Sequence, residues 1–320
     1  MVPRYELALA VRDEFGRSIA IEGLGSGGVL VGHCRTRRQA LVIEEGSLRW
    51  LGPAGRRSEA RAIADGRVYG TLEGRACWFD GNRVVELPGL GGDWSGVTGA
   101  AGRFAIGWAD TDRWDVYEAG TDNEHRSPRR VGVRWEGEHG VELSTLGGTN
   151  AMAERVNRHG VAVGDSEAVH EGTRMPCRWS SAGEVEALGD SSVRQGKATA
   201  VNEHGEIVGW IHEGNDRRYR PFVRRGDSFE RLLLPGDHAF PKDINRHGHI
   251  VGSVSWDSDE HSWPREVRAH LWVGGRAYDL NAQLDGNDSR ALYHANRIDD
   301  AGMILATRRG PDDPVLLRPR

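Results

Sequence analysis

The sequence predicts an all-β protein, a seven-bladed β-propeller of four-stranded blades whose ring is closed by an N-terminal strand that completes the C-terminal blade. Three observations lead to this prediction. A glycine motif recurs seven times, short strand-like runs bounded by Gly and Asn follow each copy, and the two chain ends supply complementary parts of one unit. Seven copies in 320 residues average about 46 residues each, the length of a propeller blade.

The repeated motif is a glycine, three residues and a second glycine, as in Gly160-Val-Ala-Val-Gly164. We expect the first glycine at a positive φ in the tight turn between a blade's first two strands, where a preceding Asn suits an Asx turn. The copy at Gly102 has one extra residue, which predicts either a β-bulge or a shifted strand, and the last copy has Ala306 as its fifth residue. The first glycines of the other copies are Gly28, Gly66, Gly205, Gly248 and Gly302.

Each motif is followed by a third and a fourth strand-like run. The third begins with a small residue and often ends in a large one, so we expect Trp135, Trp179 and Trp272 to pack between blades. Cys77 and Cys177 share one third-strand position and are expected to be buried. The fourth run ends in Leu in most copies.

The chain ends at Arg320 without a fourth strand for the seventh copy, and it opens with Tyr5-Glu-Leu7, a fourth-strand sequence without a blade of its own. Joining the two ends completes one blade and removes the exposed sheet edges of an open array. The sequence thus predicts one domain over residues 1–320. Its blades are roughly 12–51, 52–90, 91–146, 147–190, 191–234, 235–284, and 285–320 together with 1–11.

The consensus Ser-x-Ala-x-x-Ile-Asn-x-x-Gly-x-Ile-Val-Gly, followed by a segment with an aromatic residue and Trp, resembles the HAF repeat of bacteria. The stretch from Ala198 to Gly209 matches it closely, and the resemblance covers essentially the whole chain. It implies a β-propeller-like fold and no general activity. Members of this family are often extracellular.

Composition argues against several partners and compartments. Acidic residues outnumber basic ones by 47 to 42, so no overall positive field attracts nucleic acid or an anionic membrane. Neither a signal peptide near Met1 nor a membrane-length apolar run is present, which predicts a cytoplasmic protein. Three cysteines, an odd number without the Cys/His spacing of a zinc motif, argue against a disulfide framework and a structural zinc site.

Loop lengths separate the two faces of the predicted propeller. The turns between first and second strands are tight, whereas the second-to-third loops and the connections between blades are long and share the opposite face. Binding sites usually lie on long loops carried by a rigid scaffold, so we predict a site at this loop-rich mouth. The long connections are 108–130, 167–174, 210–220, 253–267 and 281–293.

The main prediction for function is a propeller that binds a small organic molecule or peptide at this mouth. Trp108 and Trp210 share one repeat position after the second glycine, and Trp256 lies four residues past Gly252, so all three can form an aromatic wall. Packing beneath their own loops is the alternative. The predicted polar groups of this site are Asp110, Asp165, His33, His212, His238 and His294.

Paired carboxylates recur near the mouth and raise the question of a metal. Oxygen ligands at alternating spacing suit Ca²⁺ or Mg²⁺, although a complete calcium-loop motif is absent, and a solvated acidic rim is the alternative. We predict no organic cofactor, because neither a P-loop nor a dinucleotide-binding fingerprint occurs. The candidate metal ligands are Asp110, Asp112, Asp257 and Asp259.

Two other functions stay open. The first is a cofactor-independent biosynthetic enzyme, a lyase, cyclase or hydrolase, in which His212 or His294 is the general base and Asp165 its partner. The second is a scaffold that binds a protein partner through the expanded third and sixth blades. A histidine and a carboxylate that meet in a concave site would favour the enzyme, and a flat aromatic face would favour the scaffold.

Overall fold

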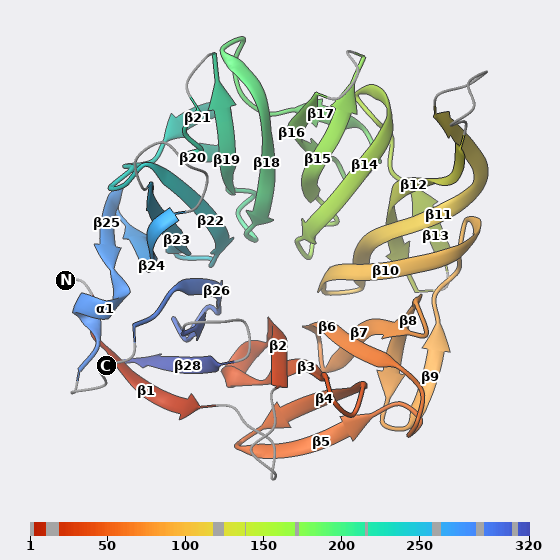
Figure 1. The fold of residues 1–320 in the computed structure, drawn as a ribbon, viewed down its shortest axis with the longest axis horizontal. Helices are drawn as coiled ribbons and strands as arrows, with labels where there is room; N and C mark the ends of the chain where they lie inside the picture. Colours follow the sequence, from red (N-terminus) through yellow and green to blue (C-terminus); the bar gives the residue numbers. More distant parts are fainter. Residues whose placement is uncertain are drawn as a thin grey trace.

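The computed structural model describes residues 3–10, 19–117, 125–137, 139–169, 173–214, 217–257, 264–285, 291–308 and 313–320. These residues form seven four-stranded antiparallel sheets arranged as a ring around a central axis, which we call the channel axis (Figure 1). The protein is therefore a seven-bladed β-propeller, as the repeat predicts. None of the helices formed by the described residues has the length and apolar character that crossing a membrane requires.

Strands of each blade follow one another in the chain, from the channel outward. The first three blades contain β2 (Ile19–Leu24), β3 (Leu30–Cys34), β4 (Gln39–Glu44), β5 (Ser47–Leu51), β6 (Ser58–Ala64), β7 (Arg67–Leu72), β8 (Arg75–Asp80), β9 (Arg83–Glu86), β10 (Gly91–Ala101), β11 (Phe104–Tyr117), β12 (His125–Glu136) and β13 (His139–Glu142). A 3₁₀ turn, η1 (Ser26–Gly28), joins β2 to β3.

The other blades repeat this order. They contain β14 (Gly147–Val156), β15 (Ala162–Ala168), β16 (Arg174–Trp179), β17 (Val185–Ala187), β18 (Val193–Val201), β19 (Ile207–Glu213), β20 (Arg220–Arg225), β21 (Ser228–Arg231), β22 (His238–Ile244), β23 (Ile250–Asp257), β24 (Pro264–Val273), β25 (Arg276–Asp279), β26 (His294–Ile298), β27 (Ile304–Thr307), β28 (Pro314–Pro319) and β1 (Tyr5–Ala10). A short helix, α1 (Leu280–Gln283), follows β25.

The ring closes through the two ends of the chain. β1 pairs with β28 as the outermost strand of the seventh blade, with Leu7 opposite Leu317, and the side chain of Tyr5 is fully buried. The backbone N–H of Arg320 donates to the carbonyl of Arg4 at 2.9 Å, so the two ends lie side by side. This closure covers the outer edge of β28.

A β-bulge interrupts the first strand of every blade at the same place. It comes just after the residue that pairs with the second glycine of the motif, or with Ala306 in the seventh blade. We call the seven bulged residues the bulge ring. Because a bulge re-aims a side chain, the ring collects one residue from each blade at the channel. Its members are Glu22, Arg61, Thr98, Glu154, Thr199, Lys242 and Asn296.

In six blades the second glycine of the motif lies against a carbonyl oxygen of the first strand, whereas the seventh blade has the same bulge without a glycine there. A Cβ placed on Gly164 would lie 1.9 Å from the carbonyl oxygen of Met152, and one on Gly107 would lie 1.8 Å from that of Gly96. Those carbonyls belong to the first strand just before its bulge. The seventh blade carries Ala306 at this position, opposite Ala295.

The copy at Gly102 contains a shifted turn. Ala101 pairs with Phe104, so Gly102 is the first residue of a two-residue turn and takes a positive φ of 53°. Gly107 still pairs with Val97 before the bulge, as the second glycine does in the other blades. The extra residue therefore comes from an earlier position of the first glycine in its turn, and the second strand keeps the register of the other blades.

Side-chain bonds of three repeated asparagines join neighbouring blades on the tight-turn face. The amide of Asn157 donates to the carbonyl of Asn202, Asn202 donates to Asn245, and Asn245 donates to Asp299, at 3.0 to 3.1 Å. Each asparagine oxygen also accepts two backbone N–H groups of its own turn, as the Asx-turn expectation requires.

Third-strand tryptophans fix the outer contacts between blades. Trp135, Trp179 and Trp272 are at most 1% exposed, which confirms their predicted burial. Each indole N–H donates to a backbone carbonyl in the connection from the preceding blade, at 2.7 to 3.0 Å. Cys77 and Cys177 are also buried, as expected.

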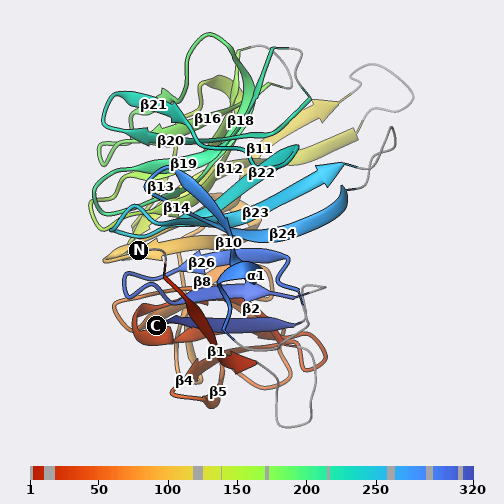
Figure 2. The same cartoon turned by 90° about the vertical axis from the view of Figure 1, so that its left-hand side faces the viewer.

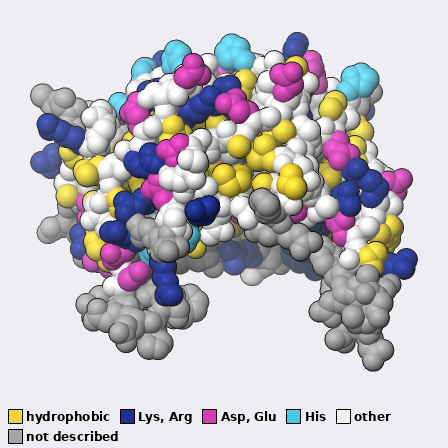
Figure 3. All heavy atoms as spheres, turned by 90° about the horizontal axis from the view of Figure 1, so that it is seen from above, with side chains coloured by type: hydrophobic (Ala, Val, Ile, Leu, Met, Phe, Trp, Pro, Cys, Tyr) yellow, Lys and Arg dark blue, Asp and Glu magenta, His cyan; other side chains and the backbone are white. Residues whose placement is uncertain are grey.

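The two faces differ as the loop lengths predict. Figure 2 shows the hairpins β11–β12 and β23–β24 extending beyond the other strands on one side of the disc. The tight turns lie at the opposite side, where they carry His159, His204 and His247, and Figure 3 shows histidine side chains along one edge of the molecule.

Candidate functional site

A cavity of about 810 Å³ opens at the loop-rich mouth of the channel, beside the first three blades. We call it the mouth cavity. A second cavity of about 800 Å³, the turn-side cavity, lies among the tight turns at the other end of the channel. Four residues line both cavities and form the channel waist: Arg61, Thr98, Arg155 and Arg297.

Two tryptophan rings line the mouth cavity, Trp94 on β10 and Trp108 on β11. Each ring lies against a glycine, because a Cβ on Gly74 would be 2.1 Å from the Trp94 ring and one on Gly96 would be 3.0 Å from the Trp108 ring. The guanidinium of Arg130 lies 3.9 Å from the centre of the Trp108 ring. Since Trp94 is 54% exposed, its aromatic surface is open to a ligand.

An ion-pair triad of Arg61, Glu22 and Glu59 also lines the mouth cavity. Arg61 contacts Glu22 at 3.2 Å and Glu59 at 2.6 Å, and Arg57 adds a second guanidinium to Glu59 at 3.0 Å. Burial by itself would raise the pKa of Glu59, but Arg61 and Arg57 outweigh it and hold that pKa below its usual range. The triad therefore presents fixed charges of both signs.

His33, predicted as a ligand-binding residue, lies on β3 close to this triad. Burial lowers the pKa of its imidazole, and the nearby charges of Glu59 and Glu22 only partly oppose that shift. Its Nδ1 atom is buried and has no hydrogen-bond partner among the residues that the structure describes. The imidazole is therefore neutral at pH 7.

The predicted tryptophan of the fifth blade lies in an aromatic cluster. The ring of Trp210 meets Tyr219 edge to face at 5.0 Å and Phe240 at 6.1 Å between centres. His212 stacks on Tyr219 at 4.8 Å. Trp210 does not line the mouth cavity, so in the described structure its ring packs beneath its own loop.

Both nitrogens of His212 and His238 already have partners. The Nε2–H of His212 donates to the carbonyl of Arg217 at 2.8 Å, and its Nδ1 accepts a long bond from Gln195 at 3.5 Å. The Nδ1 of His238 accepts from the backbone N–H of Tyr219 at 3.1 Å, so its Nε2–H faces the carboxylate of Asp257 at 3.0 Å. This histidine and carboxylate do meet, but no lone pair on the ring is left for a substrate proton.

Trp256 packs on the core between the fifth and sixth blades, with His270 at 6.1 Å and Arg268 at 5.7 Å from its ring. Its neighbour Asp257 also accepts the contact from His238 described above. Trp256 does not line the mouth cavity.

Asp110 and Asp165 are almost completely buried and hold arginines of the adjacent strands. Asp110 accepts from Arg130 at 2.8 Å, which places that guanidinium over the Trp108 ring. Asp165 is ion-paired with Arg174 and lies 3.6 Å from the amine of Lys197. Within the described part of the chain, no hydrogen bond joins Asp165 to His212 or His294.

His294 begins β26 at the channel and is exposed. The structure gives it no hydrogen bond to any described residue. Surrounding protein atoms lower the pKa of its imidazole, and the charge of Lys242 lowers it further. Of the four predicted histidines, His294 and His33 are those with an unengaged ring nitrogen.

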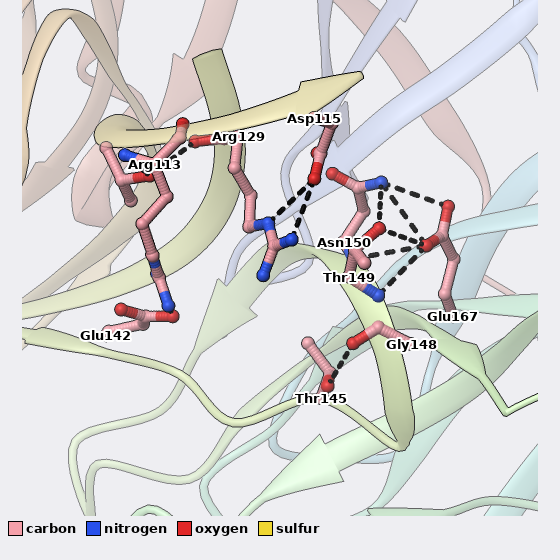
Figure 4. A network of polar contacts seen from close by, with 10 residues as sticks. Arg113, Asp115, Arg129, Glu142, Thr145, Gly148, Thr149, Asn150 and Glu167 are labelled. Atoms are coloured by element: carbon pink, nitrogen blue, oxygen red, sulfur yellow. Dashed lines mark hydrogen bonds and ion pairs between the residues drawn. The ribbon is translucent and has the colours of Figure 1, made fainter. Parts of the chain in front are cut away.

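Two further carboxylates of the third and fourth blades, Asp115 and Glu167, accept hydrogen bonds from protein donors. Figure 4 shows Glu167 accepting bonds from Thr149 and Asn150, and Asp115 paired with Arg129. These bonds outweigh burial and lower the pKa of Glu167. Among the described residues no three His, Cys, Asp or Glu side chains gather as a metal site, and the candidate ligand Asp259 lies outside those residues.

Several residues of the mouth cavity were not predicted from the sequence. Trp94 stands at the entry of a first strand, outside the repeat position that singled out Trp108 and Trp210. Glu22, Glu59 and Arg61 lie on first strands that read as ordinary alternating strands. One sequence pattern could have indicated some of these residues. When the first strands of the blades are compared, most have a polar residue four positions before the turn.

No family model and no curated protein matches the chain, so the resemblance to the HAF repeat stays a prediction. Solved structures of similar fold include streptogramin B lyase, with 10% identity, a TM-score of 0.58 and coverage of 99% of this chain and 98% of the other. A catalytically inactive virginiamycin B lyase from Staphylococcus aureus with quinupristin gives 10% identity, a TM-score of 0.55 and coverage of 98% and 99%.

The acylaminoacyl peptidase of Pyrococcus horikoshii is similar over only part of its length. It is 13% identical, with a TM-score of 0.56, and the match covers 95% of this chain and 52% of the peptidase. At such identities the comparisons establish the propeller fold alone.

Proposed function

We propose that this propeller binds a small organic molecule or a short peptide in the mouth cavity, which is lined by the rings of Trp94 and Trp108 and by the Arg61 triad. The observation that carries the proposal is the pair of tryptophan rings laid on Gly74 and Gly96 at the edge of an 810 Å³ cavity. That volume suits a drug-sized ligand. Burying the exposed ring of Trp94 would supply affinity.

Fixed charges of the cavity favour a ligand that is itself polar at one end. Five arginines and four glutamates line the mouth cavity beside the two tryptophans. Such a cavity should bind a flat or aromatic group that carries charged or hydrogen-bonding groups, as an aromatic peptide does. The virginiamycin B lyase structure with quinupristin supports the proposal, since it shows a propeller of similar size with an organic molecule.

The test is a thermal-shift and tryptophan-fluorescence screen of the full chain against metabolites and aromatic peptides. Binding should raise the melting temperature by mass action and change the fluorescence. Trp94→Ala and Trp108→Ala should each weaken a hit by about tenfold or more, because each removes one aromatic wall. Trp114→Ala is the matched control, since Trp114 is 58% exposed and does not line the cavity.

A hit that binds all three variants as it binds the parent would place the ligand elsewhere. Absence of any hit, with Trp94→Ala and Trp108→Ala as stable as the parent, would also count against the mouth cavity and would favour a protein partner.

An enzyme at the same mouth is the second candidate. His294 favours it, because this imidazole has no hydrogen bond to a described residue and its lowered pKa keeps the ring neutral and able to accept a proton at pH 7. A cofactor-independent lyase, cyclase or hydrolase would then convert the bound ligand. Replacing His294 by Gln should abolish turnover of a hit while leaving its affinity within a few-fold, and unchanged turnover would exclude this role.

A further inference from the structure

Basic side chains crowd the channel near its waist. The sequence contains only two lysines, and both stand on inner strands of neighbouring blades, Lys197 on β18 and Lys242 on β22. Arg61, Arg155 and Arg297 line the waist itself. Carboxylates lie in the same region, among them Glu22, Glu59 and Glu154, so the partners of each cation decide which of them can meet a ligand.

Two of these cations are neutralised by protein carboxylates. Arg61 is paired with Glu22 and Glu59 as described above. The amine of Lys197 contacts Glu154 at 2.5 Å and lies 3.6 Å from Asp165. Neither cation therefore has charge left to offer a ligand.

The other three cations have no such partner among the residues that the structure describes. Arg155 donates to the backbone carbonyls of Thr98 at 2.6 Å and Glu154 at 2.5 Å, and Arg297 donates to the carbonyl of Asn296 at 2.7 Å. No carboxylate of a described residue lies within ion-pair distance of Arg155, Arg297 or Lys242. Carbonyl oxygens position these side chains without cancelling their charge.

The environment of Lys242 shows the same imbalance. Its side chain is half-buried, and burial together with the charges of Lys197 and Arg155 lowers the pKa of its amine, against the opposing effect of Glu154. A cation that is buried beside other cations is costly unless an anion joins it.

The carboxyl next to Lys242 in the chain already has backbone partners. Asp243 follows Lys242 on β22, and its two oxygens accept the backbone N–H groups of Ile244 and Ile298, both at 3.0 Å. Burial raises its pKa to about 6, partly opposed by Arg155. This carboxylate is held by two backbone donors, and Arg155 is the cation whose charge acts on it.

We infer that the channel waist, with Arg155, Arg297 and the adjacent Lys242, is a binding site for an oxyanion, the carboxylate or phosphate group of the ligand that enters through the mouth cavity. Guanidinium groups match the geometry of both anions. This inference extends the proposed function by naming the chemical class of the ligand: an aromatic or apolar body for Trp94 and Trp108, and an anionic end for the waist.

The test is isothermal titration calorimetry of the full chain at low ionic strength with inorganic phosphate and, separately, with acetate. Arg297→Gln and Lys242→Met should each weaken binding of the preferred anion by about tenfold or more. Stronger binding of phosphate identifies a phosphorylated ligand, and stronger binding of acetate identifies a carboxylic acid. Absence of binding for both anions would overturn the inference.

Arg158→Gln is the matched control, because Arg158 lines the turn-side cavity but is paired with Asp65 at 2.9 Å. It should bind the anion as the parent does. An equal loss in Arg158→Gln would mean diffuse attraction by net charge and would overturn the site.

Stability separates a binding role from a structural one. Removing an uncompensated cation should leave the melting temperature of Lys242→Met, without anion, equal to or above that of the parent. A marked decrease would show that Lys242 supports the fold and would count against the inference.

Direct evidence can come from the lysines themselves, since ¹³C-dimethylation labels only Lys197, Lys242 and the N-terminal amine. Phosphate or acetate should shift the Lys242 methyl resonance more than that of Lys197, and equal shifts would contradict the site. Failure of the waist is distinguishable from failure of the mouth cavity. Anion binding that survives Trp94→Ala needs only the waist, whereas a neutral aromatic hit that survives Arg297→Gln needs only the mouth.

Discussion

A single buried carboxyl gives the channel a pH dependence of its own. Asp243 is the acidic residue whose pKa burial raises to about 6, while Arg155 opposes the shift and Asp300 adds to it. In the unfolded chain the same carboxyl titrates near its ordinary value of 3.8. Between these two values the folded protein holds a proton that the unfolded chain has released.

The sign of the effect follows from this difference. Because the folded state binds more protons between about pH 4 and 6, the free energy of unfolding should fall as the pH rises through that window. A shift from 3.8 to about 6 corresponds to about 3 kcal/mol. Asp243→Asn lacks this titration, so its stability relative to the parent should increase by that order between pH 4 and 7, measured by urea unfolding.

Parallel pH profiles of the two proteins would contradict the raised pKa. The Asp243→Asn variant also loses a hydrogen bond at every pH, because Asn cannot accept both backbone N–H groups that Asp243 accepts. The titration of Asp243 is therefore measured by how the difference in unfolding free energy between the variant and the parent changes with pH.

Within the blade, the inner hairpin explains the second glycine of the repeat. In the six blades with a second glycine, a first-strand carbonyl oxygen lies so close to that glycine that an added Cβ would overlap it. The bulge of each first strand places one side chain of each blade at the channel.

Gly164→Ala tests this explanation. The added Cβ would lie 1.9 Å from the carbonyl oxygen of Met152, so we expect a loss of about 2 to 4 kcal/mol in unfolding free energy. Gly226→Ala is the comparison, because Gly226 has a positive φ of 57° and open space around its Cβ, and should cost about 1 to 2 kcal/mol. Chemical denaturation measures both, and a cost for Gly164→Ala no larger than that for Gly226→Ala would contradict the steric account.

At the scale of the whole molecule, closure of the ring by β1 decides whether the sheet has a free edge. Tyr5 is buried completely and β1 covers the outer edge of β28. The backbone bond from Arg320 to Arg4 shows that a short turn could join the two ends.

Removing residues 1–10 should therefore lower the melting temperature and cause concentration-dependent self-association, because the edge of β28 becomes available to another chain. A circular permutant that carries residues 3–10 after Arg320, through a short Gly-Ser linker, should restore both properties. Calorimetry and sedimentation velocity measure these outcomes. A truncated chain that stays monomeric with the parent's melting temperature would show that β1 is dispensable for the fold.

The sequence by itself determined the number of blades, the strand order, the tight-turn face and the closure of the ring. These features depend on local requirements that repeat along the chain: a positive φ at the first glycine, an Asx turn at Asn157, and a large third-strand residue such as Trp179. Each requirement can be recognised within a dozen residues, so the pattern is readable without the fold.

Tertiary structure alone decided the composition of the candidate site. Trp94 and Trp108 border one cavity with Glu22 and Arg61, and these residues come from three blades. Trp108 and Trp210 occupy equivalent sequence positions but have different surroundings. Trp108 lines the mouth cavity, whereas Trp210 packs against Tyr219 and Phe240. Side chains tens of residues apart meet only when the ring closes, and what each one faces depends on its neighbours in space, which no local pattern encodes.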